Sequence, residues 1–201
     1  MALIPPEIVV LPRGTILARV YYAQSAHPTS WSHFRYFGPV NARWDHHLVN
    51  GQGDPFVQER GIYYAARSGK TSIAEFFQNT RRIDRHFQAP WLAVFETQAD
   101  LLLLDLTGAF ATRMGASIAI HSGSRARARG WARDIYEAYP SIHGIDYASS
   151  MHGGETAVAL NERAIETRFL PRFPVLNRAL ADSALLIALK NAALAVGYTL
   201  I

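Results

Sequence analysis

Three adjacent polar residues could hold a metal ion. Asp45, His46 and His47 offer one oxygen and two nitrogen ligands, which are donors that zinc accepts. Adjacent residues of an extended chain point in opposite directions, however, and no helical His-x-x-x-His pair accompanies these three. We therefore expect hydrogen-bonded or solvated histidines and no metal site.

Two further stretches resemble parts of catalytic motifs without completing them. Gly69-Lys70-Thr71 matches the end of a phosphate-binding loop but lacks the leading glycine of that motif. Ser149, Ser150 and His152 do not form the G-x-S-x-G turn that exposes a nucleophilic serine. The sequence therefore indicates neither a nucleoside triphosphatase nor a serine hydrolase.

The composition limits the remaining chemistry to oxygen and nitrogen groups. The 201 residues include no cysteine, which excludes thiolate catalysis, disulfides and cysteine-ligated metals. With 49% apolar and 18% charged residues, the chain can form one domain with a core. The net charge of +4 is small for a nucleic-acid-binding protein and compatible with an anionic small-molecule substrate.

Four other segments contain an arginine, a glutamate and pairs of tyrosines and serines in a distinctive order. They are Ala42-Arg43-Trp44-Asp45, Gly61-Ile62-Tyr63-Tyr64-Ala65-Ala66, Thr71-Ser72-Ile73-Ala74-Glu75 and Asp146-Tyr147-Ala148-Ser149-Ser150. Together they resemble the RES-domain family, which is named for an arginine, a glutamate and a serine. The resemblance extends over most of the chain, because residues 103–106 are similar to the family's central apolar strand and residues 131–135 to its later helix.

The resemblance implies three catalytic residues. Arg43 is similar to the family arginine, Glu75 to the glutamate and Ser149 to the serine. Ser150 stays open as the alternative to Ser149, because adjacent residues of a strand face opposite ways.

The resemblance also implies residues that bind the substrate. Tyr64, eleven residues ahead of Glu75, is similar to an aromatic residue on a family strand, and Tyr63 stays open as its alternative. Arg19 is similar to an early family arginine that helps to bind phosphate.

The fold and activity that the resemblance implies are those of NAD-consuming toxins. The domain would be similar to ADP-ribosyltransferase toxins and would consume NAD by phosphorolysis, as the toxin of a toxin–antitoxin pair with a helix-turn-helix antitoxin. NAD would be a substrate, inorganic phosphate a possible co-substrate, and no cofactor is expected. Water or a macromolecule stays open as the acceptor, which would make the chain an NAD glycohydrolase or an ADP-ribosyltransferase.

These residue types suit cleavage of the nicotinamide–ribose bond. That cleavage builds positive charge on the ribose, as in glycoside hydrolysis, and the Glu75 carboxylate could stabilise it. The planar fork of Arg43 suits the pyrophosphate of NAD or an incoming phosphate. Tyr64 would stack on the nicotinamide, and Ser149 would hydrogen-bond the ribose or the carboxamide.

Each of these residues also has an ordinary structural explanation. Glu75 could complete a capping box that begins at Ser72, Arg43 could pair with Asp45, and Ser149 could bond local backbone. A group of arginines indicates the solvated face of a helix. The alternative to an enzyme is a non-catalytic module that binds nucleic acid through this face. These are Arg125, Arg127, Arg129 and Arg133.

The apolar pattern predicts the elements that position these side chains. Short apolar runs indicate strands at residues 15–22, 61–66, 91–96, 101–106, 145–148 and 157–161. Helices are expected at 72–84, at 124–139 with Ser124 as the cap, and at 177–196 with Gly197 as the stop; residues 198–201 could add a closing strand.

Strands interspersed with a few helices favour an α+β fold. The family resemblance makes its centre a mixed or split sheet with flanking helices. We expect a single domain over residues 1–201, with the core motifs at about 15–165 and the last helix at about 177–196.

Nothing in the sequence indicates export or membrane insertion. Residues 1–14 have no basic segment, and Pro5 and Pro6 interrupt their apolar stretch. The longest apolar runs are far shorter than the roughly 20 residues that a membrane-spanning helix needs. We expect a cytoplasmic protein that does not bind nucleic acid directly and that could form homo-oligomers or complexes with its antitoxin.

Overall fold

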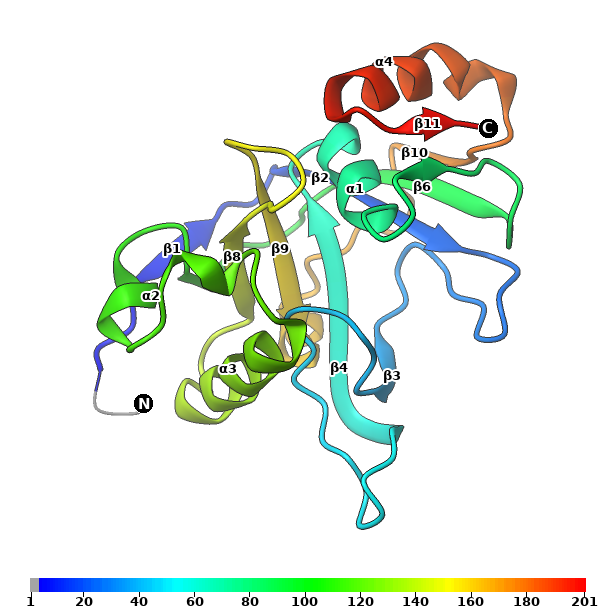
Figure 1. Cartoon of the computed structure of the whole chain (residues 1–201). Helices are drawn as coiled ribbons and strands as arrows, with labels where there is room; N and C mark the ends of the chain where they lie inside the picture. Colours follow the sequence, from blue (N-terminus) through cyan, green and yellow to red (C-terminus); the bar gives the residue numbers. More distant parts are fainter. Residues whose placement is uncertain (1–3) are drawn as a thin grey trace.

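A computed structural model describes residues 4–201 and is built around one large mixed sheet (Figure 1). The strand order is β1-β7-β8-β9-β4-β2-β6-β10, and β3 pairs with β4 off this path. Among the strand pairs of this sheet within residues 4–201, only β7 and β8 run parallel. The strands are β1 (Ile8–Leu11), β2 (Ile16–Tyr22), β3 (Arg35–Gly38), β4 (Phe56–Ala66), β6 (Pro90–Glu96), β7 (Leu101–Asp105), β8 (Gly144–Ala148), β9 (Thr156–Asn161) and β10 (Leu176–Ala179). The α+β class with a mixed sheet is therefore confirmed.

The sheet is nearly divided between β2 and β4. These two strands share a single residue pair, Ala18 with Ala66. Two residues further along β2, the backbone N–H of Val20 donates to the Ser72 hydroxyl at 3.0 Å rather than to β4. Ser72 belongs to helix α1 (Gly69–Phe76), which directly follows β4. The helix thus satisfies the backbone where the two strands separate.

The main helices all cover the same face of this sheet. Helix α1 and helix α4 (Leu186–Val196) pack over the β2–β6 half, in a core with Val20, Ile73 and Leu189. Helices α2 (Phe110–Arg113) and α3 (Arg125–Ala138) pack over the other half. On the opposite face, Tyr63 packs with Phe34, Phe95 and Phe169. The gap between β2 and β4 therefore opens on the helical face, between α1 and α3.

The predicted strands are confirmed, as is the helix capped by Ser124. The sequence runs at residues 15–22, 61–66, 91–96, 101–106, 145–148 and 157–161 correspond to β2, β4, β6, β7, β8 and β9. The Ser124 side chain accepts the backbone N–H of Arg127 at the start of α3. Strands β1 and β3 lie outside the predicted runs.

The helix expected at residues 72–84 begins earlier and is shorter. Its N-cap is Ser68, whose hydroxyl accepts the Thr71 N–H at 3.1 Å. The expected capping box of Ser72 and Glu75 is therefore wrong, and Glu75 lies in the last turn. The chain then turns and forms β5 (Arg82–Ile83), which pairs in parallel with β11 (Thr199–Leu200). The local sequence does not indicate this pairing, which places Arg82 and Ile83 in a strand and not in the expected helix.

The helix expected at residues 177–196 is also shorter. Its first residues form β10, which pairs with the edge of β6, because an available sheet edge outweighs local helix propensity. A short 3₁₀ helix (Ser183–Leu185) follows, and α4 begins at Leu186. Gly197, at φ 68°, ends α4 as expected. Strand β11 matches the expected closing strand.

No helix within residues 4–201 is long and apolar enough to span a bilayer. The first three residues of the amino-terminal segment considered above lie outside the described range.

Candidate active site

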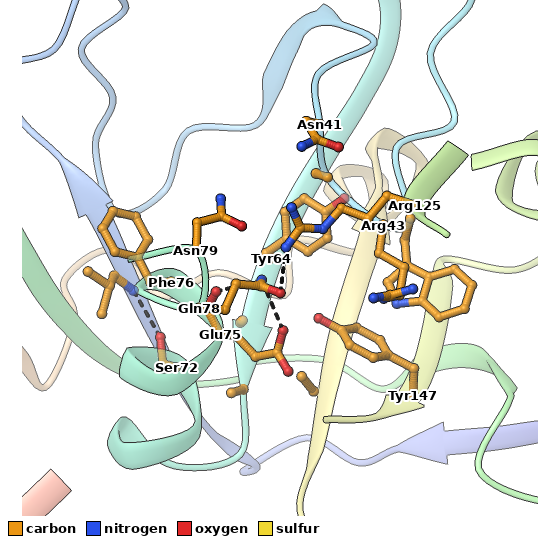
Figure 2. A pocket seen from close by; sticks show the side chains of 16 residues that line it. Asn41, Arg43, Tyr64, Ser72, Glu75, Phe76, Gln78, Asn79, Arg125 and Tyr147 are labelled. Atoms are coloured by element: carbon orange, nitrogen blue, oxygen red, sulfur yellow. Dashed lines mark hydrogen bonds between the residues drawn. The ribbon is translucent and has the colours of Figure 1, made fainter. Parts of the chain in front are cut away.

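A cavity of about 210 Å³ lies where β2 and β4 separate (Figure 2). Strands β2, β4, β8 and β9, helix α1, the loop after β3 and the start of α3 all contribute side chains to it. They include Val20, Asn41, Arg43, Trp44, Tyr64, Ser72, Glu75, Phe76, Gln78, Asn79, Arg125, Tyr147 and Ala157. The separation of the strands that α1 stabilises thus produces the cavity.

Glu75 provides the carboxylate of this cavity. Its Oε1 accepts a hydrogen bond from the Ser149 hydroxyl at 2.6 Å. The same hydroxyl oxygen accepts the backbone N–H groups of Met151, at 3.2 Å, and His152, at 3.0 Å. Ser149 is buried and does not line the cavity, so it holds Glu75 in place from behind. Ser150 is exposed, and the structure therefore brings Ser149 to Glu75.

Two tyrosines from different strands form walls beside Glu75. Tyr64 comes from β4 and Tyr147 from β8, and both line the cavity. Burial raises the pKa of both phenols, and the charge of Glu75 raises that of Tyr147 further. Both rings stay neutral at physiological pH. Sequence reasoning missed Tyr147, although its position two residues before Ser149 on a strand places it on the same face.

Arg43 lies at the other end of the cavity and binds backbone carbonyls. Its Nη1 donates to the carbonyl oxygens of Ile120, at 3.2 Å, and Gly123, at 2.8 Å. The alternative explanation of Arg43, an ion pair with Asp45, is wrong, since the buried Asp45 carboxylate binds Arg35 at 2.9 Å. Burial lowers the pKa of Arg43, and the nearby charge of Arg125 lowers it further.

Arg125 is a cavity residue that sequence reasoning assigned to a solvated helix face. Its Nη2 donates to Oε1 of Gln78 at 2.9 Å, and Gln78 in turn contacts Glu75 (Figure 2). Arg129 also turns toward the protein and donates to the Val40 carbonyl at 3.4 Å, whereas Arg127 is exposed. Two of the four arginines proposed for nucleic-acid binding therefore contact groups of the protein itself, which weakens that alternative.

Arg19 and Tyr63 lie on the opposite face of the sheet. The Arg19 guanidinium is buried 4.0 Å from the centroid of the Tyr63 ring. The Tyr63 hydroxyl donates to the Trp31 carbonyl at 2.7 Å. Neither side chain lines the cavity, so Tyr64 is the tyrosine of the doublet that faces it.

The polar cluster at residues 45–47 is part of the packing. His47 contacts Asp45, and the His46 ring stacks on Tyr136 with centroids 4.5 Å apart. Across residues 4–201, no group of three or more His, Cys, Asp or Glu side chains is arranged to hold a metal ion.

Comparisons with known proteins agree with the sequence and the fold. A chain of a solved structure described as the M. tuberculosis MbcT-MbcA toxin-antitoxin complex has the same fold, with a TM-score of 0.53 and 14% identity over 86% of this chain and 88% of that one. No curated protein matches significantly. The family model of the RES domain matches residues 16–175, most of the sequence. The chain therefore belongs to the RES-domain family.

Proposed function

We propose that this chain cleaves the nicotinamide–ribose bond of NAD and transfers the ADP-ribosyl group to inorganic phosphate, as the toxin of a toxin–antitoxin pair. The observation that carries the proposal is the Glu75 carboxylate in a cavity with neutral tyrosine walls and two arginines at its other end. Membership of the RES-domain family and the shared fold with a chain of a toxin–antitoxin complex support it.

The reaction separates charge in a way that these side chains complement. As the bond from C1′ of the ribose to the ring nitrogen breaks, its electron pair goes to the nitrogen, and nicotinamide leaves as a neutral molecule. The ribose gains oxocarbenium character, which the fixed negative charge of Glu75 stabilises. An oxygen of phosphate then bonds to C1′, and the products are nicotinamide and ADP-ribose 1″-phosphate.

The other cavity residues orient the two reactants. The rings of Tyr64 and Tyr147 offer aromatic faces to the pyridinium cation of NAD and reduce access of water. Arg43 binds phosphate oxygens through its planar fork. Ser149 positions Glu75 through the 2.6 Å hydrogen bond and does not attack the substrate.

The direct test is incubation of the purified chain with NAD, with and without inorganic phosphate, followed by mass spectrometry of the products. We expect nicotinamide together with phosphorylated ADP-ribose, formed only when phosphate is present. Free ADP-ribose in both samples would indicate a glycohydrolase, and ADP-ribose attached to a macromolecule would indicate a transferase. Absence of nicotinamide release would refute NAD cleavage.

The matched control for this test is Glu75→Gln. It keeps the size and the hydrogen-bond acceptor for Ser149 but removes the charge, so turnover should fall several hundredfold, or by about 3–4 kcal/mol of barrier. The variant should unfold at an unchanged temperature, because Glu75 does not cap α1.

We also propose that an antitoxin covers this cavity. The arginines at its mouth would accept an acidic or carboxylate-terminated segment of a helix-turn-helix partner through charge-assisted hydrogen bonds. Expression of the chain alone should arrest growth and lower cellular NAD, and co-expression of its genetic neighbour should restore both. Harmless expression of the folded chain at constant NAD would contradict the toxin assignment.

A further inference from the structure

We infer that Arg125 joins Arg43 in a two-guanidinium site for the diphosphate of a nucleotide ligand, and that Gln78 holds Arg125 in place. The identity of the ligand as NAD rests on the proposed function. The site itself consists of side chains that line the cavity, and it does not depend on any bond cleavage.

Arg125 is placed for binding by the start of helix α3. It is the first residue of this 14-residue helix, directly after the cap Ser124, and its side chain lines the cavity (Figure 2). Its Nη2 donates to Oε1 of Gln78 at 2.9 Å. An arginine has five N–H donors, so most of them are available to a ligand. The N-terminal end of a helix adds partial positive charge.

Arg43 is tied to the same helix by its backbone contacts. Its Nη1 binds carbonyls of Ile120 and Gly123, which lie just before α3. This leaves Nη2 and Nε for a ligand. The spacing of the two arginines is therefore set by the segment before α3, which binds Arg43, and by the first turn of α3, which carries Arg125.

No ion pair within residues 4–201 neutralises the charges of Arg43 and Arg125. Arg35 pairs with Asp45, Arg67 with Asp146 and Arg178 with Asp182. Within residues 4–201, neither Arg43 nor Arg125 forms an ion pair with a carboxylate. Burial and then the charge of Arg125 lower the pKa of Arg43, and the charge of Glu75 offsets this only in part. A bound anion with two negative charges relieves this repulsion, and a diphosphate supplies such an anion with oxygens for both forks.

Gln78 connects the arginine pair with the carboxylate. Its Oε1 accepts from Arg125, while its Nε2 donates to the Glu75 carbonyl at 2.7 Å and lies 3.4 Å from Oε2. One side chain thus separates a cationic site from an anionic one. In NAD a single ribose carries the reacting C1′ at one end and, through its 5′ oxygen, the diphosphate at the other. The order of charges along the cavity matches that ligand.

Calorimetric titration of the full chain with ADP-ribose, inorganic pyrophosphate and inorganic phosphate tests the inference. Arg125→Ala should weaken ADP-ribose and pyrophosphate binding roughly 10- to 100-fold, the range for lost charge-assisted hydrogen bonds. Arg125→Lys should recover only part of the loss, because an ammonium cannot bind two oxygens in a plane. The matched control is Arg127→Ala, which removes the same charge from an exposed position of the same helix and should change binding less than twofold.

The outcomes separate the two proposals. Unchanged ADP-ribose binding in Arg125→Ala would overturn the inference and leave NAD cleavage standing. Weaker binding of inorganic phosphate alone would also overturn it, because Arg125 would then serve an incoming phosphate. Arg125-dependent pyrophosphate binding in a chain that releases no nicotinamide would support the site and refute the proposed function. A wild-type chain that binds none of the three anions would overturn the inference as well.

Discussion

Two polar clusters on the helical side of β4 differ in whether their charged side chains are paired with other groups of the protein. The Glu162 cluster consists of Glu162, Tyr136, His46, Arg60 and Arg163. The Tyr136 hydroxyl donates to Glu162 at 2.5 Å, the Gly61 N–H donates to it at 2.8 Å, and the Arg163 guanidinium lies 3.9 Å from the Tyr136 ring centroid. Glu162 also lies 3.7 Å from Nε2 of His46, and Arg60 forms an ion pair with Glu137. In the cavity, by contrast, Glu75, Arg43 and Arg125 form no ion pairs within residues 4–201 and hydrogen-bond only to uncharged groups.

The contacts of the Glu162 carboxylate lie within the protein and stabilise the folded state. Burial raises the pKa of Glu162, but contacts with His46 and Tyr136 and the backbone bond from Gly61 outweigh this effect and lower the pKa to about 2. These contacts join β4, α3 and the segment after β9. The comparison indicates that one cluster stabilises the molecule, whereas the other keeps its charges available to a ligand. Substitutions should therefore separate stability from activity.

The largest effect on activity outside Glu75 is expected from Arg43→Lys. The charge is kept, but the fork that binds two phosphate oxygens is lost, so kcat/KM for NAD should fall about 100-fold, or about 2.7 kcal/mol. Steady-state kinetics with NAD would measure this. Wild-type kinetics in the variant would make Arg43 a purely structural anchor of the loop before α3.

A smaller effect, on stability alone, is expected from Glu162→Gln. The folded carboxyl has a lower pKa than an unfolded one, so its contribution is present above pH 4.5 and is lost as the pH falls toward about 2. At pH 7 the variant should lose about 2 kcal/mol of unfolding free energy, and the difference from wild type should shrink by pH 3. Urea denaturation at both pH values measures it. A constant difference across this range would mean that the charge of Glu162 does not stabilise the fold.

The smallest of these effects is expected from Ser149→Ala. The change frees Glu75 Oε1 without removing the carboxylate, so kcat should fall about tenfold while KM for NAD changes little. A loss confined to KM would instead show that Ser149 contacts the substrate. Ser150→Ala, on the exposed neighbour, is the control and should leave both constants unchanged.

The sequence predicts the cavity residues better than it predicts the ends of the helices. The order of short motifs identifies Arg43, Tyr64 and Glu75, because each motif lies within one segment. To choose Tyr64 over Tyr63, one must know which face of β4 the helices cover. That depends on packing between segments far apart in the sequence. The sequence does not fix the start of α1, because Ser68 and Ser72 are equally suitable caps by type. Only the contact with the Val20 N–H gives Ser72 another role.

Long-range contacts also explain what the sequence could not provide. Residues 176–179 form a strand because the edge of β6 is open to them. Arg125 faces the cavity because α3 docks beside the loop that carries Arg43. The local sequence does not distinguish Arg125 from the three other arginines of the same helix.

The most direct test of the central claim compares two carboxylate-to-amide changes, Glu75→Gln and Glu162→Gln, in one experiment. Nicotinamide release from NAD and the thermal unfolding temperature are measured for both variants and for the wild type. The account predicts that Glu75→Gln loses turnover several hundredfold and keeps its unfolding temperature, whereas Glu162→Gln keeps its turnover at a temperature where it is folded and unfolds earlier. Full turnover in Glu75→Gln, or a greater loss of turnover in folded Glu162→Gln, would contradict it.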